Sequence, residues 1–329
     1  MKAPILFLAL SSCLLLPEVS TAGFVSGQSA DMALGGVSPS GLIQNPEDIA
    51  VDPATQKVFV ADASLHRVLR FSSAASLENG GRAEAVFGAP DLLDRTSGTS
   101  SNQLTSPQGI CIDAGGRLWV ADSGNNRVLR FDNVTSKSSG ASADGVLGQP
   151  DFVTATSATT SSKFNRPESV SVSSSGTLYV AERNNRRVLR FDNAASLADG
   201  ANASRVYGQP DFVSNSSGIT ASTVSSLSGV LVTPDDTLWV NDRGNERLLR
   251  FDNISSKPSG AAADGVVGQK DFTSSDDTTS ARGPIDAYGQ PHLDPKGNLW
   301  IADTENNRVL RFPPDVTKPL LTVKKPAKK

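Results

Sequence analysis

One repeat of about sixty residues dominates the chain. Each copy ends in Arg-Val-Leu-Arg-Phe, or Arg-Leu-Leu-Arg-Phe once, near residues 71, 131, 191, 251 and 312. These ends are separated by 60, 60, 60 and 61 residues. Such a fixed period is typical of proteins in which each repeat is one supersecondary unit that packs against its neighbours. The repeat therefore restricts the fold to an array of five similar units.

Each copy contains three candidate strands, which we call a, b and c, and the first four copies are followed by a fourth, d. In the second copy they are residues 109–113, 117–122, 127–131 and 146–151, separated by turn residues. Aromatic residues make up only 6% of the chain, and the many Ser, Thr, Gly and Asn residues favour short strands and turns. Four short antiparallel strands form one propeller blade. We therefore predict an all-β, five-bladed β-propeller of four-stranded antiparallel blades.

The repeat also carries a recognisable motif. Its pattern is Pro-x-Gly-Ile-x-x-Asp, followed by Gly-x-Leu-x-Val-Ala-Asp-x-x-Asn-x-Arg-Val, best seen in the second copy. This pattern resembles the NHL repeat over about five copies and nearly all of residues 24–312. The resemblance implies a propeller but no single activity, because NHL propellers include enzymes, RNA-binding proteins and protein-binding scaffolds. Many family members have six blades and shorter repeats, and the extra length here lies in the loops.

The fifth copy lacks a strand d after Phe312. A similar segment, residues 24–31, lies near the start of the chain and contains the Gly27-Gln28 pair of the strand d motif. We predict that this N-terminal strand completes the fifth blade and closes the ring, because closure removes exposed sheet edges. Residues 320–323 are a competing candidate for the same edge.

Both ends of the chain differ from the repeats. Residues 1–22 have one Lys, an apolar run and small residues before Ala22, which predicts a signal peptide. The run is too short to span a bilayer, so we expect no transmembrane segment. A lipoprotein anchored at Cys13 is the alternative. We therefore expect a propeller over residues 23–312, located outside the cell or in the periplasm, and a basic tail or linker over 313–329.

The charge of the propeller limits its partners. Residues 23–312 contain 25 Lys and Arg and 32 Asp and Glu, a net charge of −7. An acidic surface binds the phosphate backbone poorly, so we predict no nucleic-acid partner. After signal cleavage Cys111 is the only cysteine, which excludes an intrachain disulfide. We expect a monomer.

Each b–c hairpin has two arginines with predicted partners. One arginine faces an aromatic residue, where cation–π contact is expected: Arg70 with Phe59, Arg130 with Trp119, Arg190 with Tyr179, Arg250 with Trp239 and Arg311 with Trp300. The other faces a carboxylate: Asp62 with Arg67, Asp122 with Arg127, Glu182 with Arg187, Asp242 with Arg247 and Asp303 with Arg308. We expect partly exposed pairs that fix the register and stabilise by ~0–1 kcal/mol each. A ring of metal ligands is less favoured, because each carboxylate already has an arginine.

No catalytic residue or cofactor is predicted. The chain has two histidines, His66 and His292, and zinc needs three or four ligands. The amidating lyases of the NHL class use a histidine-rich site that these two residues do not reproduce. No nucleophile or phosphate-binding motif is present. The sequence does not decide for or against a calcium ion in the central channel.

The long d–a loops are the most distinctive surface. They share one face of a propeller with the b–c turns, and loops of this length are either functional or poorly ordered. Residues 272–291 differ most from the repeat and provide the predicted ligand-binding residues Asp276, Asp277, Arg282, Asp286 and Tyr288. We predict an exported, non-catalytic scaffold that binds a protein, glycan or small ligand on this face. The alternative is a propeller hydrolase or lyase with a divalent ion near the channel.

Overall fold

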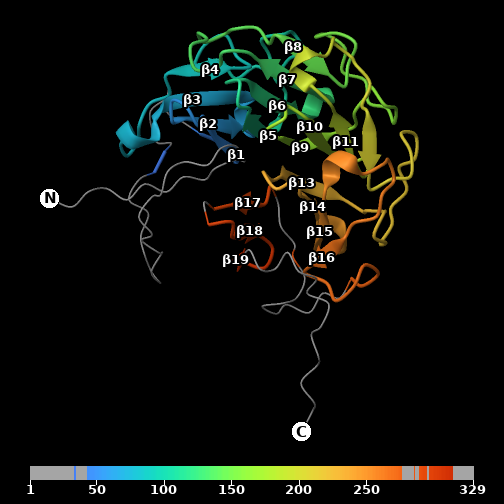
Figure 1. The fold of residues 1–329 in the computed structure, drawn as a ribbon. Coiled ribbons are helices and arrows are strands. Elements are labelled where there is room, and N and C mark those ends of the chain that lie inside the picture. Colours follow the sequence, from blue (N-terminus) through green and yellow to red (C-terminus); the bar gives the residue numbers. More distant parts are fainter. Residues whose placement is uncertain (1–32, 35–42, 276–284, 286–288, 295, 314–329) are drawn as a thin grey trace, which may run out of the picture.

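The computed structural model describes residues 33–34, 43–275, 285, 289–294 and 296–313. Five antiparallel sheets lie around a common axis as the blades of a β-propeller (Figure 1). The helical segments in the described part are 3₁₀ turns of three residues. The prediction of an all-β, five-bladed propeller is therefore confirmed.

The blades follow one another along the chain, and their strands run a to d. Blade 1 contains β1 (Pro46–Val51), β2 (Lys57–Asp62), β3 (Arg67–Ser73) and β4 (Ala85–Phe87). Blade 2 contains β5 (Pro107–Ile112), β6 (Leu118–Asp122), β7 (Arg127–Phe131) and β8 (Gly145–Leu147). Blade 3 contains β9 (Pro167–Val172), β10 (Leu178–Glu182), β11 (Arg187–Phe191) and β12 (Arg205–Tyr207). Blade 4 contains β13 (Leu227–Val232), β14 (Leu238–Asp242), β15 (Arg247–Phe251) and β16 (Gly265–Val267).

Blade 5 has three strands among the described residues. They are β17 (His292–Leu293), β18 (Leu299–Asp303) and β19 (Arg308–Phe312). The predicted closing strand, residues 24–31, and its competitor, residues 320–323, lie outside the described residues. Within the described ranges, no helix is long and apolar enough to cross a membrane.

The b–c hairpins have the predicted register in all five blades. In blade 2, Asp122 lies opposite Arg127 and Trp119 lies opposite Arg130. The other four hairpins pair in the same way. The connecting turn is a 3₁₀ turn closed by Asn126 in the left-handed region, with φ of 52°. An asparagine tolerates this conformation better than most residues, which helps the sequence to form the tight turn.

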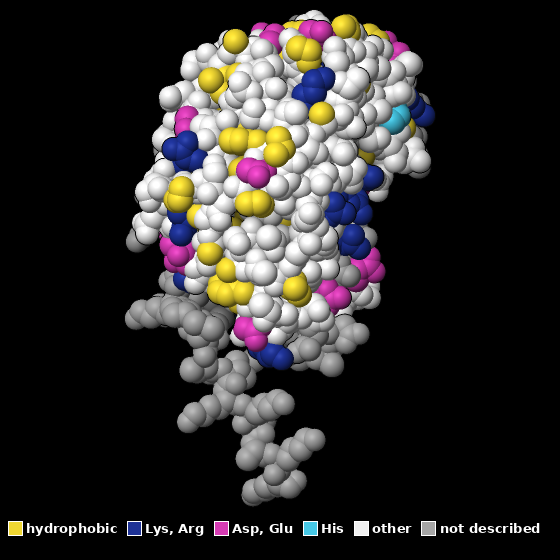
Figure 2. Space-filling view, turned by 90° about the vertical axis from the view of Figure 1, so that its right-hand side faces the viewer, with side chains coloured by type: hydrophobic (Ala, Val, Ile, Leu, Met, Phe, Trp, Pro, Cys, Tyr) yellow, Lys and Arg dark blue, Asp and Glu magenta, His cyan; other side chains and the backbone are white. Residues whose placement is uncertain are grey.

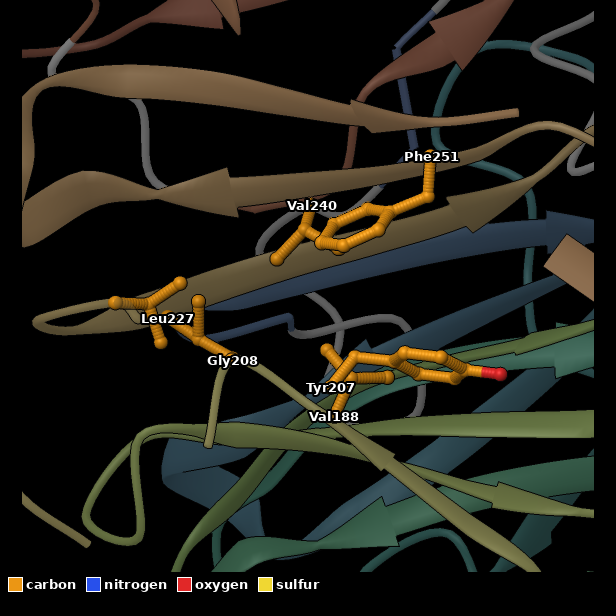
Figure 3. A pocket seen from close by; sticks show the side chains of 7 residues that line it. Val188, Tyr207, Gly208, Leu227, Val240 and Phe251 are labelled. Atoms are coloured by element: carbon orange, nitrogen blue, oxygen red, sulfur yellow. The ribbon is translucent and has the colours of Figure 1, made fainter. Parts of the chain in front are cut away.

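The hydrophobic core consists of layers between neighbouring blades. One face of blade 2, including Ala121 and Val128, packs against the opposite face of blade 3, including Val170 and Val180. The same arrangement joins blades 1 and 2, 3 and 4, and 4 and 5. Figure 3 shows residues around a small apolar gap between blades 3 and 4, which has no room for a water molecule. The alternating apolar residues of each strand thus serve two layers.

The central axis is filled where equivalent positions of strand a meet. A Cβ atom on Gly109 would lie 2.7 Å from the Cα atom of Ser169, and one on Gly229 would lie 2.2 Å from the Gly289 carbonyl oxygen. Glycine is therefore needed there for the close approach of neighbouring backbones. In the other blades this position is Asp48, Ser169 or Gln290.

Asp48 and Gln290 join distant blades across this axis. The carboxylate Oδ2 of Asp48 accepts hydrogen bonds from the backbone N–H of Ile110, at 2.8 Å, and from Nε2 of Gln290, at 2.9 Å. Gln290 also donates to the carbonyl of Val170 in blade 3, at 3.2 Å. Burial raises the pKa of Asp48 to about 7, against the hydrogen bond from Ile110. This contact therefore links blades 1, 2, 3 and 5.

Candidate ligand-binding face

In each of blades 1 to 4, one buried arginine contacts the d–a loops. Nε of Arg127 donates to Oδ2 of Asp122 at 2.7 Å. Its terminal nitrogens donate to the carbonyls of Thr99 and Gln103, at 2.6 and 2.9 Å, in the loop that precedes blade 2. They also donate to the carbonyl of Phe152 in the loop that follows. The guanidinium therefore joins one hairpin to two long loops.

This arrangement corrects our expectation that the ion pairs are partly exposed. The side chains of both partners are fully buried in blades 1 to 4, because the d–a loops fold over them. In blade 3, burial raises the pKa of Glu182 to about 7, and the charge of Arg187 opposes this shift. The carboxylates are thus engaged in the scaffold, as the arginine pairing predicted.

In blades 1 to 3, the second arginine of the hairpin joins neighbouring blades. Nη1 of Arg130 donates to the carbonyl of Ala195 in blade 3 at 2.7 Å, and its guanidinium lies 5.9 Å from the Trp119 ring centre. Arg311 lies 5.8 Å from the ring centre of Trp300. The predicted cation–π contact is confirmed for these two pairs.

In blade 1 the guanidinium lies over a different ring. Arg70 pairs with Phe59 in register, but its charge lies 5.9 Å from the ring centre of Phe87 in strand d. The reason is that Arg70 extends past its own hairpin to donate to the carbonyls of Val134 and Lys137, both at 2.8 Å, in the next blade.

The surroundings of His66 and His292 indicate that both histidines have a structural role. Nδ1 of His66 accepts a hydrogen bond from the backbone N–H of Ser106 at 3.1 Å. Asn126, one repeat later, accepts from the N–H of Arg166 in the same way, at 2.9 Å. Burial lowers the pKa of His292. In the part of the chain that the structure describes, no three His, Cys, Asp or Glu side chains gather as they would around a metal ion.

A polar groove lies between blades 2 and 3 on the face formed by the d–a loops and b–c turns. Its volume is about 290 Å³. Its walls come from the b–c turns of both blades and from the residues that lead into β5 and β9. The lining residues carry amide, hydroxyl or guanidinium groups, apart from one glycine: Ser106, Gln108, Ser123, Gly124, Asn126, Asn165, Arg166 and Asn184.

Beside this groove, the carboxylate of Glu168 partly neutralises two arginines. Nε of Arg166 donates to the carboxylate of Glu168 at 2.7 Å, and Arg183 lies 3.5 Å from the same oxygen. Nδ2 of Asn184 donates to Oδ1 of Asn165 at 3.0 Å. These contacts hold the polar side chains in fixed positions and leave hydrogen-bonding atoms toward the groove.

The side of the molecule that is at the right in Figure 1 is also largely polar. Figure 2 shows hydrophobic side chains in small separate groups on the side of the molecule that is at the right in Figure 1. Lys and Arg side chains gather along one edge of that view. Small apolar groups of this kind are normal on a protein surface and mark no docking site by themselves.

The sequence alone did not indicate this groove. The predicted ligand-binding residues belong to a d–a loop, whereas Asn184 and Arg183 lie in the b–c turn of the third repeat, where the second repeat has Gly124 and Ser123. This departure from the repeat was the available signal. The predicted residues Asp276, Asp277, Arg282, Asp286 and Tyr288 lie outside the described residues.

Comparisons with known proteins agree with this fold. The chain resembles a solved structure of a suggested gluconolactonase, with a TM-score of 0.50, 15% identity, and coverage of 83% of this chain and 76% of the other. A streptogramin B lyase structure gives a TM-score of 0.49 and 14% identity, covering 85% of this chain and 68% of the other. These identities show similarity of fold alone. No curated protein matches the sequence.

A family model gives the more specific result. The model described as NHL repeat matches residues 104–131 and 164–191, in blades 2 and 3. These two segments contain strands a, b and c of each blade. The other three blades repeat the same strand order and hairpin register. The protein is therefore a five-bladed β-propeller with NHL repeats in blades 2 and 3.

Proposed function

We propose that the protein is an exported, non-catalytic scaffold that binds a hydroxyl-rich ligand, such as a glycan, in the groove between blades 2 and 3. The observation that carries this proposal is the groove itself, with its lining of amides and hydroxyls. Side-chain amides both donate and accept hydrogen bonds, and so do sugar hydroxyls. Arg166 at the rim also suits a carboxylate on an acidic sugar.

Rigidity of the face supports a binding role. The groove borders the b–c turn of blade 2, which leads directly to the buried Arg127. Its walls are therefore fixed by the same hydrogen bonds that hold the d–a loops. A site built on rigid elements loses less conformational entropy when a ligand binds.

Binding to an array of immobilised neutral and uronic-acid oligosaccharides tests the proposal. Asn184→Leu removes an amide from the groove, and we expect the affinity for any bound glycan to fall at least tenfold. Glu305→Leu, at the same position of blade 5, is the matched control and should bind as the unaltered protein does. Failure to bind any glycan, or equal binding by Asn184→Leu, would contradict the proposal.

The alternative is a hydrolase or lyase with a divalent ion near the channel. Its test is metal analysis of the purified full chain after dialysis. A stoichiometric ion that resists dialysis would support the enzyme, whereas a metal-free protein that still binds glycan would support the scaffold.

A further inference from the structure

Strand d of each blade has a fixed set of partners. In blade 2, the N–H of Val146 donates to Oδ1 of Asp199 in the next blade at 2.9 Å, and its carbonyl accepts from the N–H of Gly200 at 3.0 Å. Val146 also pairs with Leu129 in strand c of its own blade. The valines at the equivalent positions of blades 1 and 3 have the same three partners.

The described N-terminal residues reproduce two of these three links. The N–H of Ala33 donates to Oδ1 of Asn79 at 2.7 Å, and its carbonyl accepts from the N–H of Gly80 at 3.0 Å. Asn79 and Gly80 occupy in blade 1 the positions of Asp199 and Gly200 in blade 3. Ala33 is therefore placed against blade 1 as a strand d residue of the preceding blade.

The chain then enters blade 1 as a d–a loop would. Leu34 and Ile43 pack on the blade 1 face that includes Leu69 and Phe71. The N–H of Gln44 donates to Oδ1 of Asp62 at 2.9 Å. In blade 2, the N–H of Thr105 donates to Asp122 in the same way, at 2.7 Å.

The third link would be to a strand c, and none of the described c strands pairs with Ala33. Among the described residues, β19 is the strand c whose sheet contains no strand d. Val309 of β19 is 66% exposed, whereas Val68, Val128 and Val188 at the same position are buried. Ala302 on the neighbouring strand is also exposed. Ala33 and Leu34 before blade 1 and the edge of β19 in blade 5 could therefore supply the two halves of this contact.

We propose that Ala33 and Leu34 form strand d of blade 5 by pairing with β19, which closes the ring within one chain. The register of blade 2, Val146 with Leu129 and Leu147 with Val128, assigns Ala33 to Leu310 and Leu34 to Val309. This assignment differs by several residues from the one that the Gly27-Gln28 motif predicts. The pairing covers the free edge of β19 and buries Val309.

Cysteine crosslinking in the full chain distinguishes the two registers. Cys13 and Cys111 are replaced by alanine, and Leu34→Cys is combined with Val309→Cys. Directly opposed residues of an antiparallel pair are close enough for a short crosslinker. Under mild oxidation, or with a short bis-maleimide, we expect an intramolecular link between residues 34 and 309. Ser26→Cys with Val309→Cys is the matched control for the other register, in which Ser26 takes the position of Leu147, and should remain unlinked.

Three results would overturn the proposal. A link only in the Ser26 variant would assign the strand to residues 24–31. A link between two chains would make the occupant a second copy, and the absence of any link would leave the ring open. Maleimide labelling gives an independent reading: Val309→Cys should react at least tenfold more slowly than Val213→Cys, which is 70% exposed as valine. Equal labelling rates would also contradict closure.

Discussion

Blades 2 and 5 have nearly the same hairpin sequence but different surroundings. Residues 120–131 and 301–312 share the Asn-Asn-Arg-Val-Leu-Arg-Phe ending, and both hairpins pair in the same register. The side chain of Arg127 is nevertheless fully buried, whereas that of Arg308 is 21% exposed. The register is therefore a local property of the hairpin, while burial depends on neighbouring blades and loops. The three other blades agree, because their equivalent arginines are fully buried like Arg127.

The largest expected effect comes from removing one buried carboxylate. Asp122→Ala leaves the guanidinium of Arg127 buried without its counter-charge, and we expect it to destabilise the protein by about 3–5 kcal/mol. Asp303→Ala in blade 5 leaves a partly exposed arginine that water can solvate, so we expect less than half that loss. Denaturant unfolding of both variants measures the difference. Equal losses would show that the comparison between these blades does not hold.

The second-largest expected effect is a change of stability with pH, caused by Asp48 at the central axis. The pKa of Asp48 is raised to about 7 in the folded state, from an ordinary value of 3.8. Its stabilising contribution is therefore complete below pH 3.8 and lost as the pH rises through 7, with a slope of at most about 1.4 kcal/mol per pH unit. Asp48→Asn keeps an acceptor for Ile110 without the charge, so stability should fall less between pH 5 and 8.

Thermal unfolding at several pH values checks this prediction. Asp94→Asn, on a d–a loop, is the control and should follow the unaltered protein at each pH. If Asp48→Asn had the same pH dependence as the unaltered chain, ionisation of the Asp48 carboxylate would not destabilise the folded protein. Asp48 would then differ less from the residues at the same position of the other blades than its hydrogen bonds indicate.

The smallest expected effect is the coupling between Arg130 and Trp119. A double-mutant cycle with Arg130→Ala and Trp119→Leu should give about 0.5–1 kcal/mol, because the guanidinium lies over the indole ring. The cycle for Arg70 and Phe59 should give less, because Arg70 lies over Phe87 instead. A larger coupling in blade 1 than in blade 2 would contradict the geometric assignment.

The sequence by itself determined the repeat, the number of blades, the strand order and the register of every b–c hairpin. These features depend on residues close together in the chain, such as Asp122 and Arg127 across a four-residue turn. Short-range pairing and side-chain alternation can be read directly from a repeated sequence.

Only the tertiary structure decided which surfaces meet. The d–a loops bury the ion pairs, and Asp48 meets Gln290 from a segment more than two hundred residues away. The groove joins Asn184 to residues of the previous blade, and the backbone of Ala33 is hydrogen-bonded to Asn79 and Gly80 of blade 1. The physical reason is that each of these contacts depends on how blades approach one another across the ring, which no single repeat encodes.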